Sequence, residues 1–307
     1  MSPLTPPTAE RVAAPTEERN PATADIDAVP TVEVLRRLNA EDARVPAAVA
    51  ALLPALAEVV DETVRRLRAG GRVHYFGAGT SGRVAVMDAA ELIPTFGLPP
   101  GVVVAHIAGG IKALTIPVEG AEDSAEGGAA DAAEVAAGDV VVGLTASGRA
   151  PYVAGALRAA RAMGAYTALV SANPDAALAA EADVHLGADT GPEAIAGSTR
   201  LKAATAQKLI LNGLSTAAMI ALGHTYSNLM VDLAPTNTKL RGRVLTILTE
   251  ATGLPEDTCA TALAEADGEL KTALVCLLGA VTPDDARRAL AAADGQVRAA
   301  LAASART

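Results

Sequence analysis

Short apolar runs and longer helical patterns alternate through the middle of the chain. The runs are continuous rather than alternating, which is typical of strands that are covered on both faces of a sheet. They lie at Val73–Phe76, Val102–Ile107, Val140–Leu144, Ala165–Val170 and Val184–Leu186. Helical patterns fill the gaps at about Ser81–Ile93, Pro151–Met163 and Ser198–Leu222. Strands that alternate with helices predict an α/β fold with a doubly wound parallel sheet.

The residues before the first strand divide into two parts. The first 30 hold six prolines and no apolar period, so they bury too little surface to offset the entropy lost on ordering. We expect residues 1–30 to form a partly disordered arm that docks from Thr16 onward, either on the body of the chain or on a partner subunit. From Thr31 to Gly70 the pattern is helical, and Pro54 inside it should kink or interrupt the helix.

The β-rich runs stop before about Pro235. The remainder is rich in Ala and Leu and contains a weak repeat, because Ala264–Leu274 reappears 27 residues later as Ala291–Leu301. Each copy predicts a helix, an Asp-Gly turn and a second helix, and two copies are too few for a solenoid. We therefore predict a sheet domain at residues 31–235 and a small helical module at residues 236–307.

Composition narrows the classes of partner. Of the 307 residues, half are apolar and 2% aromatic, and the net charge is -10, which argues against nucleic acid or an anionic membrane. The most apolar stretch, Leu209–Gly223, is interrupted by polar residues such as Asn212. The start of the chain has no basic, apolar signal pattern, and Cys259 and Cys276 form no metal or redox motif. We expect a soluble, reduced, cytoplasmic protein.

A glycine- and hydroxyl-rich turn follows the first predicted strand. It reads Gly77-Ala-Gly-Thr-Ser-Gly-Arg83 and opens a helix, so its backbone N–H groups suit an anion. Gly79, Thr80 and Ser81 are the candidate phosphate-binding residues. The spacing also fits a dinucleotide fingerprint, and a tight turn without any ligand is a further alternative.

A second turn of the same kind follows a later strand. Thr145-Ala-Ser-Gly-Arg149 precedes a helix, and by itself it is as consistent with a capped turn as with a ligand site. Two such turns would both lie at the carboxyl ends of strands, where open α/β sheets bind ligands. Paired Ser/Thr turns suit a phosphate held by neutral donors, which adds Ser147 and Arg149 to the candidates.

A third polar turn leads into the longest predicted helix. The stretch Gly191–Arg200 contains Glu193, Ser198 and Thr199, and Lys202 follows it. Alone, its basic residues indicate only a solvated helix face. Beside the other two turns they would supply local positive charge in an acidic protein, so these four residues complete the candidate phosphosugar-binding set.

In these turns the chain resembles the sugar isomerase (SIS) fold, which binds phosphosugars. Within that fold it closely resembles the N-acetylmuramic acid 6-phosphate etherase family over roughly Thr16 to Leu301. The shared motifs are Thr16-Glu-Glu-Arg-Asn-Pro21, Asn39-Ala-Glu-Asp42, Gly77–Arg83, Asp88-Ala-Ala-Glu91, Val118-Glu-Gly-Ala-Glu-Asp123, Gly197-Ser-Thr-Arg-Leu-Lys202, Asn228-Leu-Met-Val-Asp232 and Thr236-Asn-Thr-Lys-Leu240. Ala204 stands where the family pattern has Gly.

The resemblance implies cleavage of the D-lactyl ether of the phosphosugar by elimination and then hydration, in cell-wall sugar recycling. It implies Glu91 as proton donor to the leaving lactate and Glu122 as the second acid/base group, although one carboxyl group serving both steps stays open. Glu91 lies among apolar neighbours, where burial would raise its pKa as a general acid requires. The resemblance also implies a homodimer and no cofactor.

Two other functions fit the same fold. A phosphosugar aldose–ketose isomerase would share the phosphate turns without needing both glutamate motifs, and a phosphosugar-sensing regulator would bind without turnover. The four histidines show no ligand spacing, with His74 and His106 inside predicted strands. The sequence therefore predicts no metal site.

Overall fold

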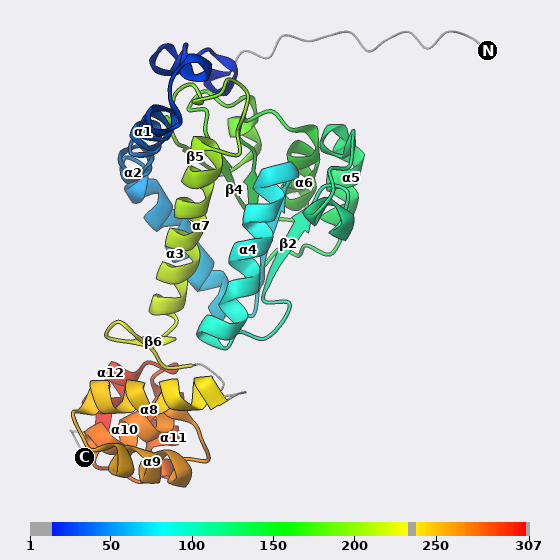
Figure 1. The fold of residues 1–307 in the computed structure, drawn as a ribbon. Helices are drawn as coiled ribbons and strands as arrows, with labels where there is room; N and C mark the ends of the chain where they lie inside the picture. Colours follow the sequence, from blue (N-terminus) through cyan, green and yellow to red (C-terminus); the bar gives the residue numbers. More distant parts are fainter. Residues whose placement is uncertain (1–13, 233–237, 305–307) are drawn as a thin grey trace.

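A single parallel sheet organises most of the chain (Figure 1). The computed structural model describes residues 14–232 and 238–304. All pairings in the five-stranded sheet are parallel, in the order β2-β1-β3-β4-β5. The strands are β1 (Val73–Gly77), β2 (Val103–Ile107), β3 (Val140–Leu144), β4 (Tyr166–Ser171) and β5 (Val184–Gly187). The predicted doubly wound sheet is confirmed.

Helices cover both faces of this sheet (Figure 1). One apolar cluster joins Val73 and Tyr75 of β1 to α3 (Leu53–Arg68), α4 (Gly79–Phe96) and α7 (Lys202–Ala221). A second cluster joins Phe76 to α6 (Pro151–Ala162) and to the residues after α5 (Ala125–Asp131). Successive residues of a strand point to opposite faces, so each buried strand contributes side chains to both apolar clusters.

The helical region before the first strand is interrupted and ends where the sequence predicts. The first helical region forms α1 (Thr31–Asp42), α2 (Val45–Ala50) and α3, and Pro54 lies in the first turn of α3, where a missing N–H costs nothing. Gly70 ends the region with a φ of +85°.

Among the described residues no single helix is long and apolar enough to cross a membrane. Only the bent pair of Thr31–Ala50 and Leu53–Arg68 meets the length and composition criterion when its two parts are taken together.

The residues from Ala14 to Pro30 form three 3₁₀ turns, at Pro15–Glu17, Pro21–Thr23 and Ile26–Ala28, against the sheet domain. The Asn20 side chain donates to the Pro192 carbonyl at 3.2 Å, and the Thr23 hydroxyl donates to the Ala194 carbonyl at 2.8 Å. Docking from Thr16 onward is therefore present within one chain. The first 13 residues of the predicted arm lie outside the described residues.

The C-terminal region packs around its own core. A hairpin of β6 (Thr225–Tyr226) and β7 (Leu229–Met230) precedes α8 (Thr238–Thr252), α9 (Glu256–Glu265), α10 (Leu270–Gly279), α11 (Pro283–Ala292) and α12 (Val297–Ser304). The predicted Asp-Gly turns are present, with positive φ at Asp267 and Asp294. The hairpin packs on this helical core, so we place the boundary near Gly223, earlier than the expected Pro235, which itself lies outside the described residues.

Candidate active site

The two hydroxyl-rich turns meet at one cavity above the middle of the sheet. β1 and β3 are neighbours, although β2 lies between them in sequence, so the chain winds outward in both directions from this pair. Ligands of open α/β sheets bind at such a point, beyond the carboxyl ends of the strands. The cavity has a volume of about 550 Å³, and its walls include Gly79, Thr80, Ser81 and Ser147. The expected convergence of the two turns is therefore seen.

The β1–α4 turn is tight because two glycines touch. A Cβ atom on Gly82 would lie 2.7 Å from the Gly77 carbonyl oxygen and 2.5 Å from Ile107, so a side chain cannot fit there. Gly79 begins α4 with a φ of +54°, a backbone conformation that favours glycine. This compact entry leaves the first N–H groups of α4 without partners inside the helix. They face the end of the sheet, where an anion would be stabilised.

The β3–α6 turn is fixed from behind by the next loop. The Asn173 side chain donates to the Ser147 carbonyl oxygen at 3.1 Å. Gly148 has a φ of +77°, and a Cβ there would lie 2.3 Å from the Cβ of Ala176. The turn is thus held in one conformation, with Ser147 and Arg149 both on the cavity wall.

Carboxylates enter the same cavity from a different segment. Glu122 and Asp123 belong to a 3₁₀ turn at Ala121–Asp123 that precedes α5, and both line the cavity. Ser124 caps α5 by accepting from the Gly127 N–H at 2.9 Å, which fixes where this turn ends. Glu122 is exposed, so solvent and a small substrate can reach it. The structure places Glu122 beside the phosphate candidates.

The third turn contributes less than the sequence suggests. Thr199 lines the cavity, while Ser198, Glu193 and Lys202 are not among the residues of its wall. Glu193 is buried and accepts the N–H groups of Lys202 and Ala203, at 3.0 and 2.9 Å. Burial raises the pKa of Glu193, against the effect of these two hydrogen bonds. A carboxylate therefore already caps α7, and this helix N-terminus has no N–H groups left there for a phosphate.

Lys202 is likewise occupied elsewhere. Its ammonium group is fully buried and lies 2.5 Å from Oε2 of Glu41. The expectation that Glu193 and Lys202 bind substrate is not met by the structure. They hold the start of α7 together instead, because a buried charge requires a partner.

Glu91 lies far from this cavity within one chain. It follows Gly79 by 12 residues on the same helix, which corresponds to about 18 Å along the axis. Glu91 is exposed, as are Met87 and Ile93 close by. The buried apolar setting expected for Glu91 is therefore absent in the single chain. One turn earlier, the Asp88 carboxylate is buried and accepts from Tyr75, Asn212 and Ser215.

Three further residues of the wall were not predicted as site residues from the sequence. They are Glu17, Thr145 and Asp123, which line the cavity. Glu17 reaches the cavity because the Gly197 N–H donates to the Thr16 carbonyl at 2.9 Å, which ties the N-terminal segment to the third turn. The motif containing Glu17 was a signal, but only the docked chain shows where it lies.

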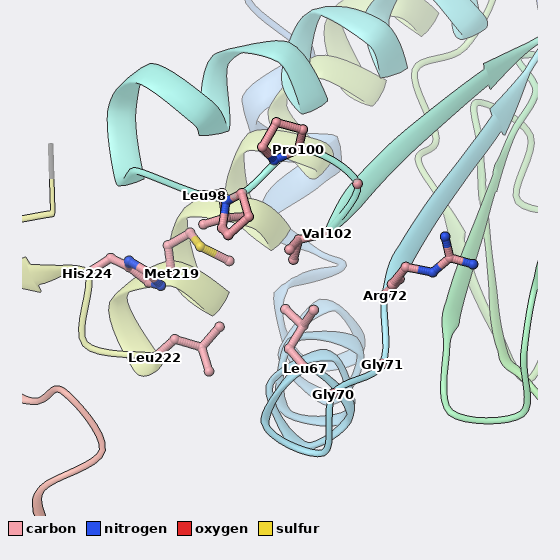
Figure 2. A pocket seen from close by; sticks show the side chains of 12 residues that line it. Leu67, Gly70, Gly71, Arg72, Leu98, Pro100, Val102, Met219, Leu222 and His224 are labelled. Atoms are coloured by element: carbon pink, nitrogen blue, oxygen red, sulfur yellow. The ribbon is translucent and has the colours of Figure 1, made fainter. Parts of the chain in front are cut away.

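A second cavity lies at the opposite, amino-terminal end of the sheet. It has a volume of about 650 Å³ and opens between the ends of α3 and α7 and the loop after α4. Figure 2 shows Leu98, Val102, Met219 and Leu222 around it, with His224 and Arg72 at its two sides. Its lining contains no carboxylate and no hydroxyl group. It therefore offers Arg72 and His224 as hydrogen-bond donors, but no carboxyl group to act with them as an acid/base pair.

Comparisons with known proteins show which family and fold the chain shares. The sequence model of the glucokinase regulatory protein N-terminal SIS domain matches residues 55–161. A phosphoheptose isomerase from Francisella tularensis has a TM-score of 0.52 and 22% identity, over 62% of this chain and 100% of its own, which supports the fold alone. The N-acetylmuramic acid 6-phosphate etherase of Cutibacterium acnes is 53% identical over 89% of this chain and 91% of its own length. That of Thermobifida fusca is 64% identical over 88% of each chain. With this identity over nearly its whole length, the chain belongs to the N-acetylmuramic acid 6-phosphate etherase family.

Proposed function

We propose that this protein is an enzyme that cleaves the D-lactyl ether of N-acetylmuramic acid 6-phosphate. The products are N-acetylglucosamine 6-phosphate and D-lactate, in the recycling of cell-wall amino sugars. The observation that carries the proposal is the juxtaposition of Glu122 with the two hydroxyl-rich turns in one cavity, in a chain 64% identical to a relative of that name. The cytoplasm is the compartment that we expect.

The phosphate would lie between the turns after β1 and β3. The N–H groups at the start of α4, with the hydroxyl groups of Thr80, Ser81 and Ser147, are the donors that the cavity offers. Arg149 adds a positive charge, while Glu17, Glu122 and Asp123 make the rest of the wall acidic. Hydroxyl groups and the N–H groups of a helix N-terminus can bind the phosphate in such surroundings. They do so without adding charged side chains that would themselves need partners.

Glu122, on the wall of the cavity, would exchange protons with the sugar. In the open-chain sugar the C1 aldehyde acidifies the proton on C2, and Glu122 would remove it. The C3–O bond then breaks as the C2–C3 double bond forms, and lactate leaves with a proton from an acid. Water adds to C3 and a proton returns to C2. General acid–base steps of this kind contribute about 10²–10⁴-fold each in rate.

Glu91 fits the role of the acid only if a second subunit supplies it. Its side chain is exposed on α4, one turn after Met87, which is 46% exposed and lies on the same face of the helix. An exposed apolar side chain beside an exposed carboxyl group would suit contact with another protein surface. In a homodimer that packs these faces together, Glu91 of one subunit would reach the cavity of the other. The exposed position of Glu91 supports this arrangement over a site built within one chain.

The two alternatives receive less support. An isomerase would need no lactyl substrate, and a regulator would need no acid/base group, whereas relatives at 53–64% identity carry the etherase name. Incubation with N-acetylmuramic acid 6-phosphate should therefore release D-lactate in stoichiometric amounts. Binding without lactate release would indicate a regulator, and formation of a ketose phosphate would indicate an isomerase.

A mixing experiment tests the shared site. Glu91→Gln and Glu122→Gln should each be nearly inactive as homodimers. A hybrid dimer would hold one site with both glutamates and one with neither. Random re-association of equal amounts should restore about one quarter of the wild-type activity, because half of the dimers are hybrids. Each variant mixed with itself is the control, and the absence of restored activity in the hybrid would show that both groups act within one chain.

A further inference from the structure

Two histidines far apart in sequence meet on the sheet face that α5 and α6 cover. His106 on β2 pairs with Phe76, which lies two residues after His74 on the neighbouring parallel strand β1, so both histidines point to the same face. Their rings stack at 5.4 Å between centroids, and Nδ1 of His74 lies 3.1 Å from Nε2 of His106. Oε1 of Glu134, after α5, lies 3.9 Å from the same Nε2. One ligand atom from each of the three residues falls within 4.8 Å of the others.

The 3.1 Å between the two ring nitrogens is close to what a tetrahedral metal ion requires. Bonds of about 2.0–2.1 Å to nitrogen or oxygen place neighbouring ligand atoms about 3.3 Å apart. Only Glu134, whose side chain is 53% exposed, needs to move appreciably, and an exposed carboxylate moves readily. Two imidazoles and one carboxylate form a donor set that zinc accepts, with a fourth position open to water.

Both rings are available as neutral ligands. Burial, with a smaller effect of neighbouring His106, lowers the pKa of His74 to about 4. Burial also lowers the pKa of His106. Each ring therefore keeps a lone pair at neutral pH, as binding to a cation requires.

A carboxylate stands behind the cluster. Nε2 of the fully buried His74 forms no hydrogen bond in the described structure, although Oδ2 of Asp139 lies only 3.4 Å away. Asp139 is held in place by the N–H groups of Arg72 and Ala136, at 2.7 and 2.8 Å. Histidines that bind a metal usually donate their other nitrogen to a carboxylate, which fixes the tautomer. The orphaned nitrogen of His74 has such a partner ready.

We propose that His74, His106 and Glu134 form a binding site for a zinc-like divalent cation, separate from the candidate active site. Asp139 would orient His74, and the ion would join β1, β2 and the connection between α5 and β3. Arg72 would compete with the ion for the Glu134 carboxylate, because one of its nitrogens lies 3.5 Å from that group. Zinc would have to displace this pairing, so the affinity depends on a competition that can be measured.

Calorimetric titration of untagged, chelator-treated protein with Zn²⁺ tests the proposal. We expect one ion per chain with a micromolar or tighter Kd, and a rise in Tm at zinc about 100-fold above Kd. His106→Leu should weaken binding at least 100-fold, and Glu134→Gln at least tenfold. His185→Leu is the matched control, because His185 lies on strand β5 and contacts Ser171 instead. Arg72→Gln should tighten binding, because it frees Glu134.

Several outcomes would overturn the site. Wild-type protein that binds no zinc at about 100 μM would do so, because a micromolar Kd predicts near-saturation at that concentration. Equal binding by wild type and His106→Leu would assign the ion to surface carboxylates. Weaker binding by Arg72→Gln would contradict the role of Glu134. None of these readouts uses lactate release, so failure of the zinc site and failure of the proposed etherase activity are distinguishable.

Discussion

Lys202 and Glu41 form a buried ion pair between the start of α7 and the end of α1. Their side chains are 0% and 7% exposed, and Nζ lies 2.5 Å from Oε2. Burial acts to raise the pKa of Glu41, but hydrogen bonds from Lys202 and Asn20 lower it overall. Lys202, which the sequence associates with phosphate binding, thus pairs with a carboxylate that also holds the N-terminal segment through Asn20.

Lys202→Met should destabilise the fold strongly. Removing one partner leaves Glu41 buried and uncompensated, which typically costs about 3–5 kcal/mol. The double variant Lys202→Met, Glu41→Leu should recover most of this loss in urea unfolding, because neither charge remains. If the double variant also keeps the wild-type KM, Lys202 has no direct role in binding the substrate. A large KM increase in a stable double variant would restore Lys202 to the binding site.

Ser81→Ala and Ser147→Ala test the phosphate position. Each removes a hydroxyl group from the cavity wall, and a hydrogen bond to a charged group contributes about 1.5–3 kcal/mol. We expect KM for the phosphosugar to rise about 10- to 100-fold in each variant, with little change in Tm. Ser198→Ala is the control, because Ser198 lies next to the wall residue Thr199 without lining the cavity. An unchanged KM in both test variants would remove the phosphate from these turns.

Glu91→Gln tests the acid and separates the two proton transfers. The side chain keeps its size but cannot deliver a proton, so kcat should fall about 10²–10⁴-fold. KM should change little, because the phosphate is held elsewhere. If Glu122 removes the C2 proton, this variant should still exchange that proton for deuterium from solvent, as NMR would detect. Loss of exchange would assign both transfers to Glu91, and near-normal turnover would leave Glu91 without a catalytic role.

Acid unfolding should depend on Glu62. Hydrogen bonds from Arg65, opposed by burial and aided by Arg66, lower the pKa of Glu62 to about 2. The folded-state pKa lies below the ordinary 4.5, so this stabilisation is present above about pH 4.5 and is lost as the pH falls toward 2. Since the pair is partly exposed, we expect Glu62→Gln to cost about 1 kcal/mol at pH 7.

The cost of Glu62→Gln should be clearly smaller at pH 3, where wild type has already lost part of the interaction. Urea unfolding at both pH values measures this difference. Glu58→Gln, at an exposed position one turn earlier on α3, is the control and should show no such change. An equal cost at pH 3 and pH 7 would argue against the ion pair.

Two truncations test the boundary near Gly223. Ending the chain at Thr249 keeps Val244, Ile247 and Leu248, which are at most 5% exposed in the intact module, but removes the helices that cover them. Such a chain should aggregate. Ending it at Gly223 removes those residues as well, so light scattering should report less aggregation. Equal aggregation of both would show that the sheet domain itself depends on the module.

The order of elements was determined by the sequence. Val140–Leu144 forms a strand with the predicted bounds, and α4, α6 and α7 begin within four residues of their predicted starts. Local rules suffice there, because continuous apolar runs, proline near helix starts and glycine after helix ends act over a few residues. The turn Gly77–Arg83 could be predicted for the same reason, because its glycines are required by close backbone contacts within the turn itself.

What only the tertiary structure decided is which side chains share a site. The sequence places Glu193 and Lys202 among the phosphosugar-binding candidates, yet in the folded chain both are buried. Glu193 caps α7 and Lys202 pairs with Glu41 of α1. His74 and His106, 32 residues apart, have no ligand spacing until parallel pairing places them on one face. Strand register, burial and the docking of distant segments depend on the packing of the whole chain, so they cannot be predicted from the spacing of residues along the sequence.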